Sequence, residues 1–273
     1  MLRLGHLSSK GRLFAQLGPF GPSGSVYDHV VAPMLRNVAQ PAIVAGSGSL
    51  GAAFSALAHL DGMPPLTVVC PESTRAEVLD FILRQPVKLL RSPASSGLLG
   101  THDIAMAEQW AEGARVIHTP RRRASMTLAL RDTVGAALAV SLGGLREHEA
   151  PHPQGLFMPV GSGALIEGVM LAVAKANLDV TAFGSVAVVP NTRQDGVASL
   201  ESAPPLDFVQ MTVVDDAQAE RSQMDLARRE GLVVGLGSAG ALYAAQNALD
   251  EGRVASAIVL VVDGRGPWDW DQG

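Results

Sequence analysis

Short apolar runs alternate along the chain with longer segments in which apolar residues recur at helical spacing. The runs that are typical of strands cover 42–46, 66–71, 87–90, 115–119, 155–161, 186–190, 208–214 and 257–264. The segments of helical length cover 50–61, 73–84, 102–113, 125–142, 164–177, 217–230 and 239–251. This alternation predicts βαβ units, and therefore an α/β protein with mostly parallel sheets.

Two stretches break the alternation and are predicted to be loops. The sequence "GGLREHEAPHPQG" covers 143–155, and "NTRQDGVASLESAPPLD" covers 191–207. The second stretch is rich in Pro, Ser and charged residues and shows no hydrophobic period, which is typical of a long surface loop.

Composition narrows the class of protein. The chain has 273 residues, of which 47% are hydrophobic and 17% charged, and its formal net charge is −5. The negative charge argues against nucleic acid or an acidic membrane surface as a partner. No stretch reaches the roughly 18 uninterrupted apolar residues of a membrane-spanning helix, the N-terminus lacks the apolar core of a signal peptide, and Cys70 is the single cysteine. We therefore expect a soluble cytoplasmic protein without an intrachain disulfide.

Three Gly/Ser loops open helices: "GSGSLG" at 46–51, "GSGAL" at 161–165 and "GLGSAG" at 235–240. Such a loop exposes backbone N–H groups at a helix N-terminus, which binds phosphate or carboxylate. One loop alone is weak evidence, because tight turns need glycine anyway. Three in one α/β chain favour an anionic ligand in a cleft at the carboxyl ends of the strands. None matches a nucleotide-binding motif, since the first lacks an acidic ribose partner and no P-loop occurs.

The stretch "GPSGSVYDHVVAPML" at 21–35 is similar to an active-site turn, because a Gly/Ser loop opens a helix beside a large side chain, Tyr27. Two interpretations of Tyr27 stay open. Its hydroxyl can act as a general acid or as a hydrogen-bond donor to a carbonyl. Alternatively, its ring fills a pocket.

The order of these motifs resembles that of the fold-type II pyridoxal-phosphate enzymes, the group of cysteine synthase, threonine synthase and tryptophan synthase β. The opening "GPFGPSGSVYDHVV" is similar to the family motif N-P-x-G-S-x-K-D-R, and "AGSGSLGAAF" to its S-G-N-T-G loop. "FMPVGSGALIEGV" resembles the G-T-G-G-T phosphate loop, and "IVLVVDGRGPWD" the closing T-G-H-G-L-K-D of threonine synthase. The resemblance covers nearly the whole chain.

The resemblance implies a tryptophan synthase β-like architecture of two α/β domains. The large domain would combine 1–36 with 126–273, and the small domain would comprise 37–125. The family also implies a homodimer with a ligand in the cleft between the domains.

Departures from the family pattern fall on its cofactor contacts. The resemblance places the Schiff-base lysine on Tyr27, and a phenol cannot form that bond with the cofactor's aldehyde. It places the Asn of the ring hydroxyl on Ser49, the last hydroxyl of the phosphate loop on Leu165, and the group that faces the pyridine nitrogen on Asp263. The lysines of the chain lie outside the motif, at Lys10, Lys88 and Lys175. We therefore expect no cofactor, with non-covalent pyridoxal phosphate as the less favoured alternative.

The pocket that the resemblance implies has Tyr27 and Asp263 as candidate catalytic residues. The candidate ligand-binding residues come from two Gly/Ser loops and are Ser47, Gly48, Ser49, Gly161, Ser162 and Gly163. Asp263 ends a predicted buried strand. It either pairs with Arg265 or is a catalytic carboxylate with a raised pKa.

Two other groups carry weaker signals. His148 and His152 share an irregular Pro-rich loop with Glu147 and Glu149, which lacks the geometry of a metal centre, so no metal is expected. Cys70 follows apolar strand residues and is interpreted as an inert buried thiol.

Three functional hypotheses remain. The first is a PLP-independent enzyme of a specialised biosynthetic pathway, which would act on an anionic, amino-acid-like or acyl molecule through Tyr27 and pocket hydroxyls. The second is a non-catalytic pseudoenzyme that binds a metabolite or regulates or scaffolds a partner enzyme. The third is a non-covalent pyridoxal-phosphate binder of the cysteine synthase or threonine synthase type.

Overall fold

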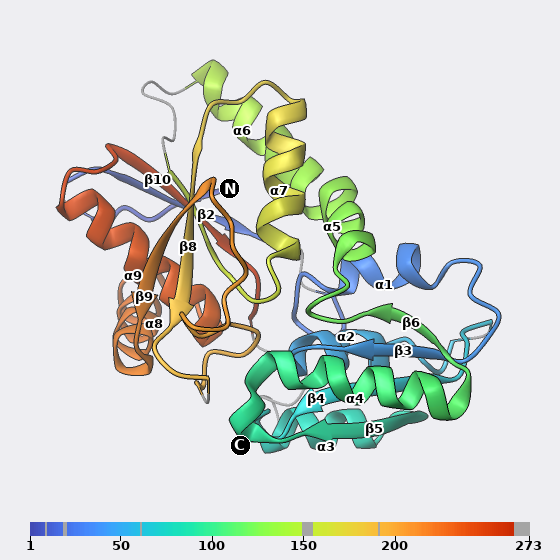
Figure 1. The fold of residues 1–273 in the computed structure, drawn as a ribbon. Helices are drawn as coiled ribbons and strands as arrows, with labels where there is room; N and C mark the ends of the chain where they lie inside the picture. The colour runs from blue at the N-terminus through green and yellow to red at the C-terminus, as the bar shows by residue number, and fades with distance from the viewer. Residues whose placement is uncertain (9, 19–20, 61, 149–154, 191, 265–273) are drawn as a thin grey trace.

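The computed structural model shows two parallel-dominated sheets, each flanked by helices (Figure 1). The residues that it describes are 1–8, 10–18, 21–60, 62–148, 155–190 and 192–264. In this part of the chain, α/β architecture with mostly parallel strands is confirmed. The division into two domains stays a prediction.

The larger sheet has the strand order β1-β2-β10-β7-β8-β9. Its strands are β1 (Leu2–Arg3), β2 (Arg12–Leu17), β7 (Gly155–Pro159), β8 (Thr181–Ala187), β9 (Val209–Val214) and β10 (Ser256–Val261). Only β1 runs antiparallel to its neighbour among these described strands. β7 and β10 are buried along their whole length, which explains their unbroken apolar sequences.

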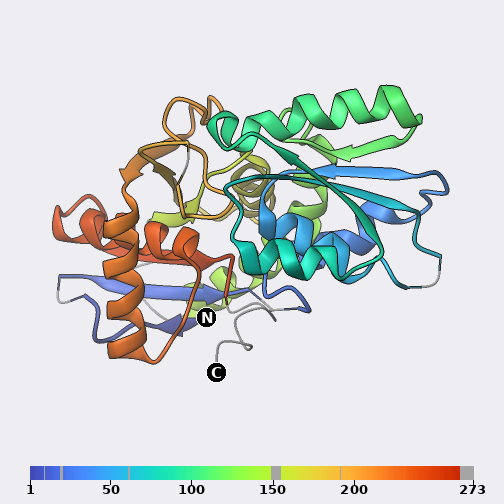
Figure 2. The same ribbon diagram turned by 90° about the horizontal axis from the view of Figure 1, so that it is seen from below.

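The smaller sheet has the order β5-β4-β3-β6, and all its described pairs are parallel. Its strands are β3 (Ala42–Ala45), β4 (Leu66–Pro71), β5 (Val87–Ser92) and β6 (Arg115–His118). Figure 2 shows this sheet between helices on both faces, as parallel crossovers require.

The described helices connect the strands in chain order. They are α1 (Asp28–Leu35), α2 (Gly48–Ala56), α3 (Ala76–Leu83), α4 (Gly97–Glu112), α5 (Ala124–Leu130), α6 (Ala136–His148), α7 (Ala164–Lys175), α8 (Asp216–Glu230) and α9 (Leu236–Asp250). A π-helical turn at Arg131–Gly135 joins α5 to α6.

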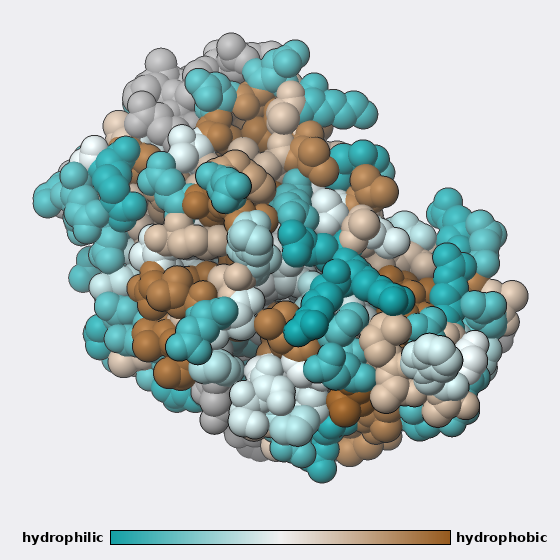
Figure 3. Space-filling model, viewed as in Figure 1, coloured by the Kyte–Doolittle hydropathy of each residue, from teal (hydrophilic) through white to brown (hydrophobic). Residues whose placement is uncertain are grey.

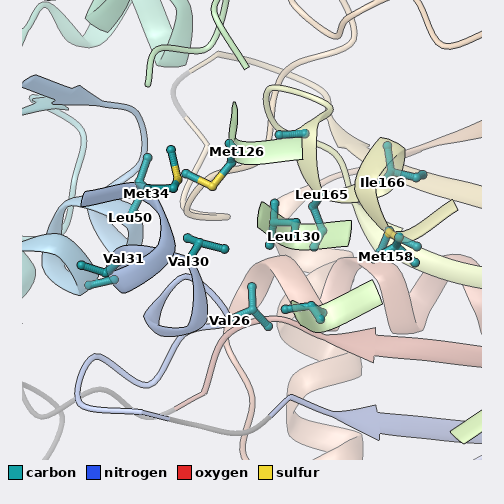
Figure 4. Packing of buried hydrophobic residues seen from close by; sticks show 14 of the residues in the cluster. Val26, Val30, Val31, Met34, Leu50, Met126, Leu130, Met158, Leu165 and Ile166 are labelled. Atoms are coloured by element: carbon teal, nitrogen blue, oxygen red, sulfur yellow. The ribbon is translucent and has the colours of Figure 1, made fainter. Parts of the chain in front are cut away.

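One hydrophobic cluster extends from the small sheet to the large one. It contains Val44 of β3 and Ile258 of β10, and α1 contributes Val30 to it. Figure 4 shows the α1 side chains lying among those of α2, α5 and α7, with Met34 beside Met126. Because α1 is packed from several sides, the loop that precedes it is held in place between the two sheets.

Three expectations about elements need correction. The strand expected at 186–190 is β8, which runs earlier, over Thr181–Ala187, because Val188 and Val189 are about half exposed and lie past the sheet. The loop expected from 143 onward is helical as far as His148. β2 was not predicted, although its middle residues are buried.

The stretch 191–207 is not simply a surface loop. Gln194 is 1% exposed and Ser199 is 1% exposed, and Val197 and Ala198 between them are also buried. The N–H of Ala198 donates to the carbonyl of Val160, 2.8 Å away, and the N–H of Ala187 donates to the carbonyl of Ala198. Backbone bonds to β8 and its neighbour therefore hold this arm inside the protein, which a polar composition did not reveal.

The helical run Ala124–Leu145 is long and apolar enough to cross a membrane by length and composition, with 28% of its apolar window buried. An ion pair between Arg131 and Asp132 lies in its middle. Hydrophobic and hydrophilic side chains are mixed over this face of the molecule (Figure 3). A single such helix is weak evidence for a membrane span, because core helices of soluble proteins can be equally long and apolar. The absence of a membrane partner stays a prediction.

Candidate functional site

The three predicted glycine loops meet at one place between the sheets. A small inner cavity of about 20 Å³ is lined by Ser49 of α2, the 161–163 loop before α7, and Asp263. An outer cleft of about 600 Å³ adjoins it and is lined by Gly235 and Leu236 of the third loop, together with Ser49 and Asp263. The inner cavity has room for about one water molecule.

Tyr27 is held at this cavity by the segment that precedes α1. The N–H of Val26 donates to the carbonyl of Val262, 2.9 Å away, and the N–H of Gly264 donates to the carbonyl of Gly24, also at 2.9 Å. This pairing with the chain after β10 brings Tyr27, the N-cap residue of α1, next to Asp263. The local sequence shows the turn, but only the pairing shows what the turn faces.

The Tyr27 hydroxyl keeps its proton. Burial, and then the negative charges of Asp195 and Asp263, raise the pKa of Tyr27 well above its usual value, and a hydrogen bond with Ser47 opposes this only in part. Tyr27 is therefore a neutral hydrogen-bond donor at neutral pH and not a base.

Asp263 lies at the N-terminus of α9. Its carboxylate accepts hydrogen bonds from the backbone N–H of Ser238, 3.1 Å away, and from the Ser238 hydroxyl. A Cβ at Gly235 would lie 2.0 Å from its Oδ2, so the close approach needs glycine there. Burial raises the pKa of Asp263 to about 6. The hydrogen bonds from Ser238 lower this pKa, and the negative charge of Asp195 raises it further. The predicted partner Arg265 lies outside the described residues.

Asp195 is the residue of the site that sequence reasoning missed. Its Oδ1 accepts a hydrogen bond from the N–H of Gly48 at 3.0 Å, and its Oδ2 accepts one from the N–H of Ser49 at 2.8 Å. Both donors belong to the first turn of α2, where the helix dipole favours negative charge. The only local signal was the Asp-Gly pair at 195–196, which indicates a turn without saying where it lies.

The 161–163 loop presents three consecutive N–H groups. Gly163 has φ +87°, a conformation that favours glycine, and it caps the N-terminus of α7. Within the described residues, the N–H groups of Gly161, Ser162 and Gly163 donate to no protein acceptor. Such a nest of donors at a helix N-terminus suits a phosphate group.

Ser47, Gly48 and Cys70 lie outside the lining of the inner cavity. Ser47 is buried and caps α2, since its Oγ accepts from the N–H of Leu50 and lies 3.2 Å from the Ser49 hydroxyl. Gly48 lies against the side chain of Thr74. The Cys70 thiol is buried, and burial raises its pKa, in accord with an inert thiol.

The described residues contain no group of three or more His, Cys, Asp or Glu side chains that could hold a metal ion. His152 lies outside the described residues. The lysines lie elsewhere: Lys10 donates to the carbonyl of Asp250, Lys88 pairs with Glu108, and Lys175 is in the last turn of α7.

Comparison with known proteins agrees with the fold. A family model described as "Pyridoxal-phosphate dependent enzyme" matches residues 1–264. A lysine-to-alanine variant of O-ureido-L-serine synthase, solved with O-ureido-L-serine bound, has a TM-score of 0.84 and 15% identity, covering 96% of this chain and 86% of that one. A hydrogen sulfide-producing enzyme from Fusobacterium nucleatum has a TM-score of 0.80 and 14% identity, covering 98% and 93%.

A second hydrogen sulfide-producing enzyme, solved as an aspartate-to-asparagine variant, has a TM-score of 0.82 and 18% identity, covering 96% of this chain and 84% of that chain. At such identities these structures establish the fold and no more. No curated protein sequence matches the chain.

The prediction that the chain takes no cofactor is wrong. The family whose model spans the chain is defined by pyridoxal phosphate, which points to that cofactor. The structure fits it in part: the N–H groups of 161–163 suit its phosphate, and the Asp263 carboxylate suits a protonated ring nitrogen. The lost side-chain contacts at Ser49 and Leu165 do not decide whether the cofactor binds, because the backbone donors of 161–163 do not depend on side-chain identity.

Proposed function

The chain belongs to the pyridoxal-phosphate dependent enzyme family, and from this premise we propose that it is an enzyme that holds the cofactor between its two sheets without a covalent bond to lysine. The substrate class that we propose is an amino acid related to serine, by analogy with the O-ureido-L-serine of one structural neighbour. The observation that carries the proposal is the meeting of the 161–163 donors, Tyr27 and Asp263 at one cavity.

The residues of this chain would divide the work of binding. The N–H groups of 161–163 would bind the phosphate, with the N-terminus of α7 behind them. Asp263 would hold a proton on the ring nitrogen. The two Ser238 donors stabilise its ionised carboxylate, which is the form that pairs with a protonated nitrogen. When bound, pyridoxal phosphate supplies a ring that withdraws electrons from the substrate's α-carbon.

Tyr27 would act as a fixed proton donor. Its raised pKa keeps the hydroxyl protonated, and it lies where the resemblance places the family's lysine. A neutral donor in a site with little water can stabilise developing negative charge on an oxygen. The described positions of Lys10, Lys88 and Lys175 support a cofactor held by non-covalent contacts alone.

A second candidate is a non-catalytic relative that binds a metabolite or regulates a partner enzyme. The small volume of the inner cavity, about 20 Å³, favours it. The homodimer and the cytoplasmic location also stay predictions, and light scattering of the purified protein measures the first of them.

The test is a binding titration of the purified protein with pyridoxal phosphate by equilibrium dialysis, with pyridoxal as the matched control ligand. We expect pyridoxal to bind at least about tenfold more weakly, because it lacks the phosphate that the 161–163 donors would bind, and each factor of ten corresponds to about 1.4 kcal/mol. Borohydride treatment followed by intact mass should show no covalent adduct. Equal binding of both ligands, or no binding of either, contradicts the proposal and favours the non-catalytic candidate.

A further inference from the structure

A separate cleft of about 380 Å³ adjoins the inner cavity and shares part of its wall. Gly161 and Ser162 line both spaces, whereas Tyr27 and Asp263 line the inner cavity and not this cleft. We call it the arginine cleft, and its further lining includes Leu98, Leu99, Arg121, Arg123, Glu201 and Pro204. Its volume lies in the range of small-molecule sites.

Two arginines of the turn between β6 and α5 line the arginine cleft. The N–H of Arg122 closes this turn by donating to the carbonyl and to the hydroxyl of Thr119, at 3.0 Å each. Arg121, inside the turn, is exposed, and among the described residues its guanidinium has no hydrogen-bond or ion-pair partner. Arg123 donates to Glu167 through Nε and Nη2, so its Nη1 donors stay available, since a guanidinium has five N–H groups.

The opposite charge in the cleft comes from Glu201 of the arm at 191–207. Glu201 lies in a tight turn, where the N–H of Ala203 donates to the carbonyl of Ser199 at 2.8 Å and the Ser202 hydroxyl accepts from the N–H of Ser199 at 3.1 Å. The Glu201 carboxylate is exposed and, within the part of the chain that the structure describes, has no hydrogen-bond or ion-pair partner. Arg121 and Glu201 therefore line one cleft without pairing with each other, and both charges can bind a ligand.

Much of the remaining wall of the arginine cleft is apolar. Leu98 and Leu99 belong to the first turn of α4 and are half-buried, as is Pro204 on the opposite-charge arm. An apolar group placed against them would leave water, which favours binding. A ligand that matches this cleft thus carries an anionic group, a cationic group and a small apolar body.

We propose that the arginine cleft binds a free amino acid with an apolar side chain. Arg121 and Arg123 bind its carboxylate, Glu201 binds its ammonium group, and the apolar wall takes its side chain. An α-amino acid carries both charges on one carbon beside its side chain, which is the combination that the lining offers. The site is independent of the proposed function, because these three charged residues do not line the inner cavity.

The experiment is a titration of the purified protein with L-leucine, followed by saturation-transfer NMR without added cofactor. N-acetyl-L-leucine, which lacks the ammonium group, and L-leucinamide, which lacks the carboxylate, are the matched control ligands. We expect saturable binding of L-leucine and binding of each control that is weaker by at least about threefold, the modest effect of an exposed ion pair. A lack of saturable L-leucine binding, or equally tight binding of either control, overturns the proposal.

Three variants test whether the bound leucine lies in the arginine cleft. Arg121→Gln and Glu201→Gln should each weaken L-leucine binding by at least about threefold. Arg115→Gln is the matched control, since Arg115 is an exposed residue of β6 outside the cleft lining, and it should leave binding unchanged. All three side chains are exposed, so the variants should keep the fold. Equal weakening by Arg115→Gln and Arg121→Gln would exclude the cleft as the site.

Combining these variants with the control ligands separates binding from a general loss of structure. Glu201→Gln should not change the binding of N-acetyl-L-leucine, and Arg121→Gln should not change the binding of L-leucinamide. In each combination the ligand already lacks the group that the substituted side chain would bind. Weakening of all three ligands alike would indicate a structural effect and contradict the proposal.

Equilibrium dialysis with pyridoxal phosphate distinguishes this inference from the proposed function. If L-leucine binding depends on Arg121 and Glu201 while pyridoxal phosphate does not bind, the amino-acid site stands and the proposed function fails. If pyridoxal phosphate binds while L-leucine binding depends on neither residue, the proposed function stands and the amino-acid site fails.

Discussion

Asp195 lies against Ser49, with 2.8 Å between its Oδ2 and the Ser49 backbone nitrogen, although 146 residues separate them in sequence. The contact places a second carboxylate at the cavity that Asp263 also lines. Each carboxylate lies at the N-terminus of a helix, α2 for Asp195 and α9 for Asp263. Burial raises the pKa values of Asp263 and Tyr27 most, and the negative charge of Asp195 raises both further, so this long-range contact contributes to the acid–base behaviour of the site.

Asp263→Asn should make stability less dependent on pH between about pH 4 and pH 6. Burial, then Asp195, raise the pKa of Asp263 from 3.8 to about 6. The folded wild type therefore holds a proton that the unfolded chain has released, and its stability falls as pH rises through this window. The shift corresponds to at most about 3 kcal/mol, since one pKa unit corresponds to about 1.4 kcal/mol.

Urea unfolding of both proteins across this pH window measures the effect. The difference in unfolding free energy, Asp263→Asn minus wild type, should grow more positive from the acid end to neutral pH. Equal slopes in the two proteins would show that Asp263 titrates normally.

Gly161→Ala should destabilise the fold by roughly 1–3 kcal/mol, the usual cost of overpacking. The new Cβ would lie 2.1 Å from the Gly196 carbonyl oxygen, so the arm that carries Asp195 must move. The matched control is Gly144→Ala in α6, where a Cβ meets nothing within 4 Å and should stabilise the helix by up to about 1 kcal/mol. Chemical denaturation measures both, and a neutral Gly161→Ala would mean that the two backbones can separate at little cost.

Arg123 and Glu167 should couple by about 1–2 kcal/mol in a double-mutant cycle. The pair is bidentate, with 2.9 Å from Arg123 Nε to Glu167 Oε2, and both side chains are about one quarter exposed. It ties the start of α5 to the first turn of α7, beside Gly163. The cycle uses Arg123→Ala, Glu167→Ala and the double variant. Additive effects of the two substitutions would show that the pair contributes no more than a solvent-exposed one.

Tyr27→Lys should gain a borohydride-reducible bond to added pyridoxal phosphate, detected by intact mass and mapped to residue 27. The amine would lie by the cavity that the 161–163 donors and Asp263 line, and an amine, unlike a phenol, can form a Schiff base with the cofactor's aldehyde. Tyr27→Phe is the control, since it removes only the hydroxyl and should gain no adduct. If Tyr27→Lys binds the cofactor yet forms no adduct, residue 27 does not stand in the place of the family's lysine.

The apolar runs were enough to locate most elements. β4 matches its predicted range of 66–71, because a strand buried on both faces reads as an unbroken run of apolar residues. β8 was placed too late, since its own sequence contains Gly184 while the exposed Val188 and Val189 follow it. β2 has only four apolar residues among its six. This pattern does not distinguish a strand near the edge of a sheet from a turn.

By itself, the sequence determined the glycine loops at the strand ends and the apolar core, because backbone donors and hydrophobic period are local properties. It also placed Tyr27 and Ser49 near the N-termini of helices. Only the tertiary structure decided that Asp195 meets the N-terminus of α2 and that Asp263 lies at that of α9. Polar residues in a stretch without period carry no sign of their partners, since a contact across 146 residues depends on how the whole chain folds back on itself.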